Sequence, residues 1–296
     1  MEIRRIKIDE FYALRDLLDS VFTVKNNRET LFIKTFPRFF ANPNTYATDG
    51  HLGAFEDGKL IGTAAMYPLD YVVGGEHLRL IANGNVAVHP DYRGRGVMSA
   101  LLKAINTECD KRADLCYLHG DPVRYERFGY LSGGIQYNAI FKPGNSNGYK
   151  FLPMTKEHVA FNLALWESKS DYIARNHSDF IPAVRTGYRD AVSVFDQNNN
   201  PVGYISLNRE LGSVAEFGIS EEKETEVFFS LSKALGRDVN VLVSGYDIKT
   251  LNRIKPFAQI KESEPAQFRI IHPERIKEVA LRAGLDENVL YAPYLT

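Results

Sequence analysis

The sequence predicts an α/β (α+β) protein in which helices pack on mixed, mostly antiparallel sheets. Hydrophobic residues make up 44% and charged residues 25% of the 296 residues, a balance typical of globular domains. Strand-like and helix-like apolar patterns alternate along the chain. The same order of elements begins again after a break rich in Gly, Pro and Asn at residues 142–148, so we expect two units of about 150 residues each.

The first unit, expected over residues 1–142, alternates strands and helices. Glycine-containing turns join its three central strands, which predicts that these strands are antiparallel neighbours. The predicted elements are a strand at 2–8, a helix capped by Asp9, a helical region around 30–40, strands at 52–55, 60–67 and 78–88, a helix at 95–112 and a strand at 115–118. This order indicates one layered domain.

The second unit, expected over residues 149–296, repeats this order in weaker form. Its hairpin Phe195-Asp196-Gln197 with Val202-Gly203 echoes Phe55-Glu56-Asp57 with Ile61-Gly62. The predicted elements are a strand at 149–152, a helix capped by Thr155, the hairpin, a strand at 214–219, a helix at 221–235 and a strand at 239–243. We interpret this as a degenerate duplication.

Composition lowers the expectation for several classes of partner. The net charge is -1 with interspersed signs, which gives no reason to expect binding of nucleic acid. The chain has no Cys/His cluster with the spacing typical of metal ligands, which gives no reason to expect a metal. No apolar run approaches the roughly 20 residues that cross a membrane, and the start does not read as a secretory signal. We therefore expect a cytoplasmic protein with Cys109 and Cys116 as buried, reduced thiols.

The most informative segment runs from Asn85 to Ser99, where a strand ends in a glycine-rich turn that opens an amphipathic helix. The first amides of a helix lack partners, the helix dipole adds positive charge, and glycines allow close approach of the backbone, so this turn predicts an anion site. Arg93 and Arg95 can add charge-assisted contacts. The segment lacks the Gly-Lys-Ser/Thr of a nucleotide P-loop and the third glycine of a dinucleotide turn.

The segment resembles the acetyl-CoA signature of the GNAT N-acetyltransferase superfamily, Arg/Gln-x-x-Gly-x-Gly/Ala after a Val-x-Val-x-Pro strand, with Met98 where Gly or Ala is usual. The resemblance implies a GNAT acyl-CoA N-acyltransferase fold in two tandem units, with acetyl-CoA as co-substrate. It implies that strand residues pair with the pantetheine arm and that turn amides hold the pyrophosphate. The residues so assigned are Val86, Val88, Arg93, Gly94, Arg95, Gly96, Val97, Met98 and Ser99.

A second segment, Tyr125 to Tyr130, resembles the Tyr-x-x-Phe-Gly-Tyr/Phe segment common in GNAT enzymes. The resemblance implies that Tyr125 protonates the departing thiolate, a role open to a phenol beside a developing anion. The structural alternative for Tyr125 is core packing.

The general base is less defined, because an amine must lose a proton before or during its attack on a thioester. His119 and Asp121 follow the strand at 115–118 and are the nearest titratable candidates. His119 is the candidate base, although it can equally be a hydrogen-bonding residue at a strand end. We expect Asp121 to cap the next helix, ahead of Pro122.

Two GNAT-like units with one CoA turn resemble the enhanced intracellular survival type of acetyltransferase, a bacterial group with a third, sterol-carrier-like domain. Residues 219–224, at the equivalent turn of the second unit, have no glycine and three carboxylates, so we expect no CoA binding there. Residues 268–275 resemble the entry into the third domain, which we expect to be absent. In the family the C-terminal carboxylate supplies the base, which this departure puts in doubt, and we expect the tail at 288–296 to be disordered.

The expected function is transfer of an acetyl group from acetyl-CoA to a primary amine, on a small molecule or a peptide, by direct attack. The alternative is a non-catalytic acyl-CoA-binding or regulatory protein. A further interpretation makes the second unit an interaction surface for a homo-oligomer.

Overall fold

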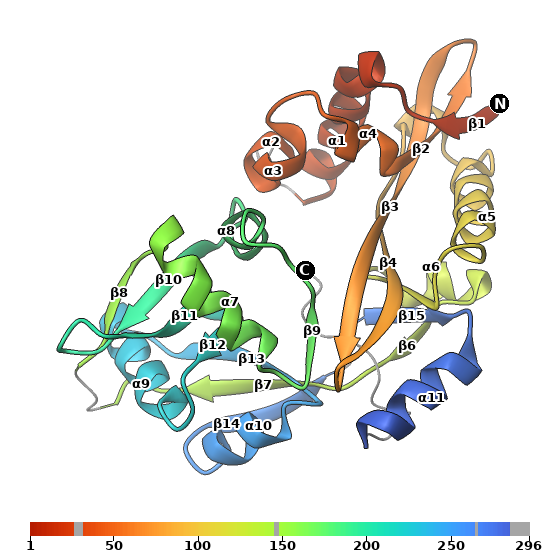
Figure 1. Cartoon of the computed structure of the whole chain (residues 1–296). Coiled ribbons are helices and arrows are strands. Elements are labelled where there is room, and N and C mark those ends of the chain that lie inside the picture. Colours follow the sequence, from red (N-terminus) through yellow and green to blue (C-terminus); the bar gives the residue numbers. More distant parts are fainter. Residues whose placement is uncertain (27–31, 145–147, 264–265, 285–296) are drawn as a thin grey trace. The chain divides into compact units, whose positions relative to one another are not determined.

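The computed structural model describes residues 1–26, 32–144, 148–263 and 266–284 (Figure 1). Its contacts divide the chain into two compact units. Unit 1 comprises Met1–Leu69, Leu78–Leu131 and Gln267–Arg275. Unit 2 comprises Asp70–His77, Ser132–Ala266 and the chain from Ile276 onward.

The first sheet has the strand order β1-β2-β3-β4-β5-β15-β6, and β9 pairs with the end of β3. The pairs β1–β2 and β2–β3 are antiparallel, whereas β4–β5 is parallel, so the sheet is mixed as predicted. Its strands are β1 (Glu2–Arg5), β2 (His51–Glu56), β3 (Lys59–Val73), β4 (Glu76–Val88), β5 (Leu115–Leu118), β6 (Leu131–Gly133), β9 (Asp171–Ile173) and β15 (Ala266–Ile270).

Helices cover both faces of this sheet within unit 1 (Figure 1). The helices α1 (Phe11–Asn26), α2 (Phe32–Thr35), α3 (Pro37–Phe40) and α4 (Thr45–Asp49) lie on one face, and α5 (Val97–Cys109) lies on the other. The amphipathic helix predicted after the glycine-rich turn is confirmed, because α5 buries one apolar stripe: Val97, Leu101, Leu102, Ile105 and Cys109. Cys109 and Cys116 are free, buried thiols, which confirms that prediction.

The start of the chain corrects two predictions. The first strand ends at Arg5 rather than at residue 8, and Asp9 lies inside a 3₁₀ turn, Ile8–Glu10, instead of capping a helix. The turn forms because the Glu10 carboxylate accepts hydrogen bonds from the Lys7 amide at 2.8 Å and from the Arg4 guanidinium at 2.7 and 2.8 Å. The helix α1 therefore begins at Phe11.

The helical region predicted around residues 30–40 lies partly outside the described residues. From Phe32 it forms two short helices instead of one. The break falls at Phe36, with φ -129° and ψ 64°, because the residue before a proline is disfavoured in the helical conformation.

The second sheet has the order β14-β7-β13-β12-β11-β10-β8. Its strands are β7 (Gln136–Phe141), β8 (Lys150–Pro153), β10 (Asp190–Phe195), β11 (Pro201–Asn208), β12 (Ser213–Ile219), β13 (Val239–Ser244) and β14 (Gln259–Ser263). The remaining helices are α6 (Pro122–Tyr125), α7 (Val159–Glu167), α8 (Phe180–Val184), α9 (Glu224–Leu235), α10 (Ile248–Ile254) and α11 (Pro273–Ala283). Thr155 is the N-cap of the 3₁₀ turn Lys156–His158 that leads into α7, as predicted.

Each unit contains a strand, a helix and a second strand parallel to the first. In unit 1 these are β4, α5 and β5, and in unit 2 they are β12, α9 and β13. A helical crossover of this kind is the usual way to join parallel neighbours. The repeated arrangement agrees with the second round of elements that the sequence predicts.

The strands beside these parallel pairs come from distant parts of the chain. Next to β5 stands β15, and next to β13 stands β7, both antiparallel to their neighbours. The division after Leu131 thus differs from the expected break at residues 142–148, because β7 completes the sheet of unit 2 before that break is reached.

In the ranges that the structure describes, no helix is long and apolar enough to cross a membrane.

Candidate active site

The strands β4 and β5 pair only over a short stretch. Their parallel register runs from Leu80 opposite Leu115 to Ala82 opposite Tyr117, whereas β4 continues to Val88. In the described pairing, the end of β4 therefore keeps a backbone edge on the β5 side that an extended ligand can pair with. The predicted pantetheine-binding residues Val86 and Val88 lie on this edge and are half-buried.

Two glycines shape the turn that follows β4. Gly94 and Gly96 have φ of 74° and 79°, in the left-handed region that favours glycine. Gly96 is the N-cap of α5, and its carbonyl accepts the first helical hydrogen bond from the Ala100 amide at 3.0 Å. A Cβ at either glycine would meet nothing within 4 Å. The backbone conformation, rather than lack of space, requires glycine here.

The first turn of α5 supplies amides that have no partner inside the helix. These belong to Val97, Met98 and Ser99, and the last two residues are half-buried. Val97 is 3% exposed and packs on Gly62 of β3, where a Cβ would lie 2.8 Å from Val97 Cγ1. The absence of a side chain at Gly62 thus anchors the start of α5 on the sheet.

The two predicted phosphate-binding arginines differ in their surroundings. Arg95 donates to both carboxylate oxygens of Glu56, at 2.8 and 2.9 Å, and its guanidinium lies 5.0 Å from the ring centroid of Tyr92. Arg93 is exposed and donates from Nε to the Val88 carbonyl at 3.4 Å. Arg93 is therefore the more available cation at the turn.

Sequence reasoning did not single out Arg127, which reaches the same helix start. Its Nη2 donates to Ser99 Oγ at 3.5 Å, and its guanidinium lies 5.0 Å from the ring centroid of Phe128. The signal was present, because Arg127 lies inside the Tyr125–Tyr130 motif, but only folding brings that motif to the start of α5.

Tyr125, the predicted acid, is the last residue of α6 and is half-buried. Its ring packs on Gly120, where a Cβ would lie 2.4 Å from Tyr125 Cε2. Burial raises the pKa of the phenol, which therefore stays protonated at neutral pH. Asp121 caps α6 by accepting from the Val123 amide at 3.2 Å, and Pro122 follows at the first helical position, as predicted.

A buried hydrogen-bond network fixes the end of this motif. The Tyr130 hydroxyl donates to Asn83 Oδ1 at 2.8 Å and lies 3.0 Å from Asn106 Oδ1. Asn106 in turn donates to the Phe128 carbonyl at 2.9 Å. The motif is thereby attached to both β4 and α5, which flank the turn.

His119, the candidate base, lies just after β5 and is exposed. Its ring stands edge-on to the buried ring of Tyr117, with centroids 5.7 Å apart. The side chain of His119 thus combines this ring contact with exposure to solvent.

The helix start at the equivalent place in unit 2 is occupied by an ion pair. Glu224, the first residue of α9, is 2% exposed and lies 2.5 Å from Arg253 Nη2. A carboxylate there satisfies the positive end of the helix dipole and would repel a phosphate.

The fold and the turn define the class of this chain, which has the GNAT N-acyltransferase fold, and the family comparison agrees. Residues 2–132 match the family model of an acetyltransferase (GNAT) domain. This part of the chain, which is less than half of its length, is therefore similar to a GNAT acetyltransferase domain. No curated protein matches the sequence.

Solved structures share this fold over most of the chain. A probable N-acyltransferase from Enterococcus faecalis is 16% identical, with a TM-score of 0.67 over 92% of this chain and 73% of its own. A GCN5-related N-acetyltransferase from Kribbella flavida is 16% identical, with a TM-score of 0.67 over 93% and 73%. Eis1 from Mycobacterium abscessus is 18% identical, with a TM-score of 0.58 over 94% and 76%.

Proposed function

We propose that this protein transfers the acetyl group of acetyl-CoA to an amine by direct attack of the amine on the thioester. The observation that carries the proposal is the turn at residues 94–96, where left-handed glycines open the helix α5 beside the unpaired end of β4. Unit 1 alone would bind acetyl-CoA, because an ion pair occupies the start of α9 in unit 2. The acceptor would be an amine on a small molecule or a peptide.

In this proposal the backbone of Val86 and Val88 pairs with the pantetheine arm, and the amides at the start of α5 hold the pyrophosphate. The exposed Arg93 would contact phosphate oxygens, and so would Arg95 if it left Glu56. The residues proposed for this role are Val86, Val88, Arg93, Gly94, Arg95, Gly96, Val97, Met98 and Ser99.

The proposed reaction forms one C–N bond and breaks one C–S bond. The amine nitrogen attacks the thioester carbonyl carbon, the carbon–sulfur bond breaks, and the thiolate of CoA takes a proton from the phenol of Tyr125. His119 takes the proton that the amine loses and passes it to solvent. Tyr125 then recovers its proton from solvent.

Titration calorimetry with acetyl-CoA tests the binding step. We expect the wild-type protein to bind and Gly96→Glu to lose binding, because the new side chain adds negative charge and backbone strain at the turn. Gly75→Glu is the matched control, since Gly75 also has a positive φ, of 85°, with nothing within 4 Å of a Cβ. Failure of the wild type to bind acetyl-CoA would refute the proposal.

A second variant separates catalysis from binding. We expect Tyr125→Phe to lower kcat for acetyl transfer by about 100-fold or more, with acetyl-CoA affinity unchanged. The measurement is CoA release in the presence of a panel of amines. Binding without turnover by the wild type, on every amine, would favour a non-catalytic acyl-CoA-binding protein.

A further inference from the structure

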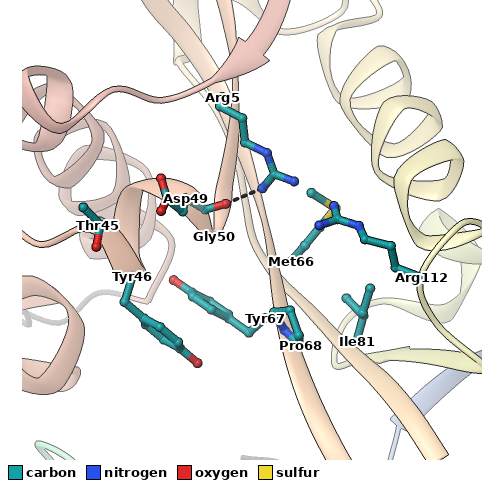
Figure 2. A pocket seen from close by; sticks show the side chains of 10 residues that line it. All are labelled: Arg5, Thr45, Tyr46, Asp49, Gly50, Met66, Tyr67, Pro68, Ile81 and Arg112. Atoms are coloured by element: carbon teal, nitrogen blue, oxygen red, sulfur yellow. Dashed lines mark hydrogen bonds between the residues drawn. The ribbon is translucent and has the colours of Figure 1, made fainter.

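Unit 1 contains a cavity of about 520 Å³ at the far end of α5 from the glycine turn (Figure 2). Its volume lies within the range of small-molecule sites. Four segments of unit 1 besides α4 line it: the end of β1, the middle of β3, β4, and the loop after α5. The lining residues are Arg5, Thr45, Tyr46, Asp49, Gly50, Met66, Tyr67, Pro68, Ile81 and Arg112.

Two guanidinium groups approach this cavity, Arg5 from β1 and Arg112 from beyond α5 (Figure 2). The side chains are 39% and 46% exposed. The carboxylate of Glu108 forms ion pairs with both, at 3.9 Å from Arg5 and 3.0 Å from Arg112, and with Lys111 at 3.2 Å. The charged residues that line the cavity are thus two cations, Arg5 and Arg112, and one carboxylate, Asp49, which leaves one net positive charge on its wall.

The longer of these ion pairs leaves Arg5 poorly compensated. Its Nη1 donates to the backbone carbonyl of Asp49. Burial and the nearby charge of Arg112 both lower the pKa of Arg5. An anion between the two guanidinium groups would relieve their repulsion and could accept hydrogen bonds from both.

Besides Thr45, Asp49 and Gly50, the rest of the wall is apolar and aromatic. Met66, Pro68 and Ile81 provide aliphatic surface, and the rings of Tyr46 and Tyr67 stack with centroids 5.5 Å apart and planes 17° from parallel. The ring of Tyr67 lies directly on Gly50, where a Cβ would be 2.6 Å from Tyr67 Cε1. The aromatic wall is therefore held in place by α4 and its end.

We propose that this cavity is a second ligand site of the protein, which takes a small organic monoanion with its carboxylate between Arg5 and Arg112 and its flat apolar body against Met66 and the tyrosine rings. Thirteen residues of α5 separate this end from the glycine turn, a length of roughly 20 Å. The site is thus distinct from the turn proposed for acetyl-CoA and does not depend on that proposal.

The test is calorimetric titration of the full chain with 3-phenylpropionate. Two comparison ligands are 3-phenylpropanol, which keeps the body without the charge, and inorganic phosphate, which keeps a charge without the body. We expect 3-phenylpropionate to bind at least about tenfold more tightly than either comparison ligand. The alcohol cannot form the charge-assisted pair, and phosphate cannot make the apolar contact.

Variants locate the site. Arg112→Gln should weaken 3-phenylpropionate by about tenfold, whereas Lys111→Gln, which removes the same charge from a neighbour that does not line the cavity, should change its affinity less than about twofold. If Arg112→Gln unfolds, Arg112→Lys replaces it in the test. Arg112→Lys keeps the charge but loses the forked donor, so it should also weaken the binding of 3-phenylpropionate. Circular dichroism checks the fold of each variant.

Three results would overturn the proposal. The first is absence of binding by 3-phenylpropionate. The second is an equal loss of 3-phenylpropionate affinity in Arg112→Gln and Lys111→Gln, which would indicate a general charge effect. Displacement of 3-phenylpropionate by acetyl-CoA would instead make the cavity part of the CoA site. Because the titration uses protein without acetyl-CoA, its outcome is independent of whether acetyl transfer is found.

Discussion

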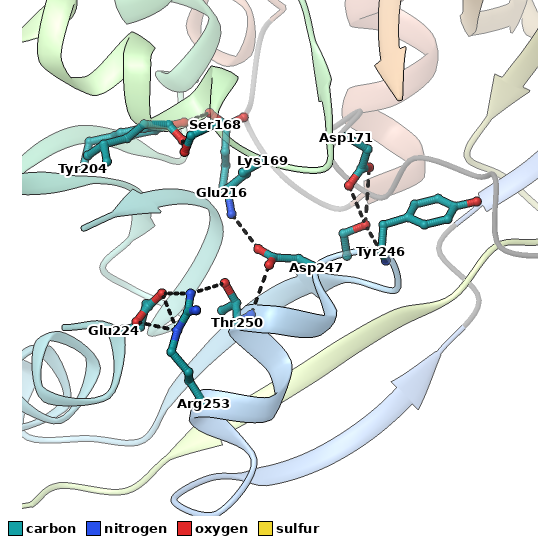
Figure 3. A network of polar contacts seen from close by, with 12 residues as sticks. Ser168, Lys169, Asp171, Tyr204, Glu216, Glu224, Tyr246, Asp247, Thr250 and Arg253 are labelled. Carbon is teal, nitrogen blue, oxygen red and sulfur yellow. Dashed lines mark hydrogen bonds and ion pairs between the residues drawn. The ribbon is translucent and has the colours of Figure 1, made fainter. Parts of the chain in front are cut away.

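At the residue scale, a carboxyl group in unit 2 is buried without a cation in direct contact among the described residues. Asp171, which Figure 3 shows within a network of polar contacts, is 1% exposed. It accepts hydrogen bonds from Ser244 Oγ at 3.1 Å and from the Tyr71 hydroxyl at 3.2 Å. The ammonium of Lys169 in the same network pairs with Asp247 at 2.8 Å. Burial raises the pKa of Asp171 from 3.8 to about 7.

This raised pKa predicts that stability depends on pH. Between pH 4 and pH 7 the unfolded chain has lost the Asp171 proton while the folded chain retains it, so stability falls as pH rises, by at most about 1.4 kcal/mol per pH unit. Asp171→Asn should remove this component of the slope. Urea unfolding at several pH values between 4 and 8 measures it, with Asp190→Asn as an exposed control. An unchanged slope in Asp171→Asn would contradict the assignment.

At the element scale, the start of α5 and the start of α9 show how the same geometry is used in two ways. Both helices follow a strand of a parallel pair. At α5 the nearby carboxylate belongs to Glu56, which lies outside the helix and binds Arg95. At α9 the carboxylate belongs to Glu224, which is the first residue of the helix itself (Figure 3). Only the first arrangement leaves the helix amides available to an incoming anion.

Removing the carboxylate beside α5 should therefore improve the proposed site. In Glu56→Gln, Arg95 loses its ion pair and the turn loses a negative charge, so we expect acetyl-CoA to bind about two- to fivefold more tightly, an effect in the range of partly exposed pairs. Titration calorimetry measures this. Glu157→Gln, which changes the net charge equally in unit 2, should have no effect. Weaker binding by Glu56→Gln would mean that Glu56 positions Arg95 instead.

At the scale of the whole molecule, the sheet of unit 1 depends on a strand that follows it by more than a hundred residues. Gln267 to Ile270 of β15 pair with β5, and Phe268 is 4% exposed with its ring 6.2 Å from that of Tyr117. The family model ends at residue 132 and does not include β15. Residues 2–132 alone would leave the edge of β5 open.

We therefore expect Phe268→Ala to destabilise unit 1 by about 3 kcal/mol or more, the usual cost of removing a buried phenylalanine ring. Phe257→Ala is the matched control, since Phe257 is 56% exposed, and it should cost less than about 0.5 kcal/mol. Urea unfolding gives both values. Equal stability of the two variants would show that β15 contributes little to unit 1.

Features that depend on neighbours in the chain were predictable from the sequence. The stripe on α5, the glycine turn before it, the bounds of β5 and the cap at Asp121 are confirmed, because periodicity, left-handed glycines and capping side chains act within a few residues. The predicted Asp9 cap is wrong, because the Glu10 carboxylate, which Arg4 holds, accepts from the Lys7 amide and places Asp9 inside a 3₁₀ turn that begins after Lys7.

The sequence by itself thus determined the elements, the helix-opening turn of the candidate site and its nearest residues. Only the tertiary structure decided which strands from distant parts of the chain are neighbours, because the alternating apolar pattern of a strand does not specify its partner and the strand can pair with any open edge. For that reason β15 beside β5, Arg127 at Ser99 and the guanidinium pair of Arg5 and Arg112 could not be predicted from the sequence. Each joins residues that are far apart in the chain and become neighbours only when the sheet forms.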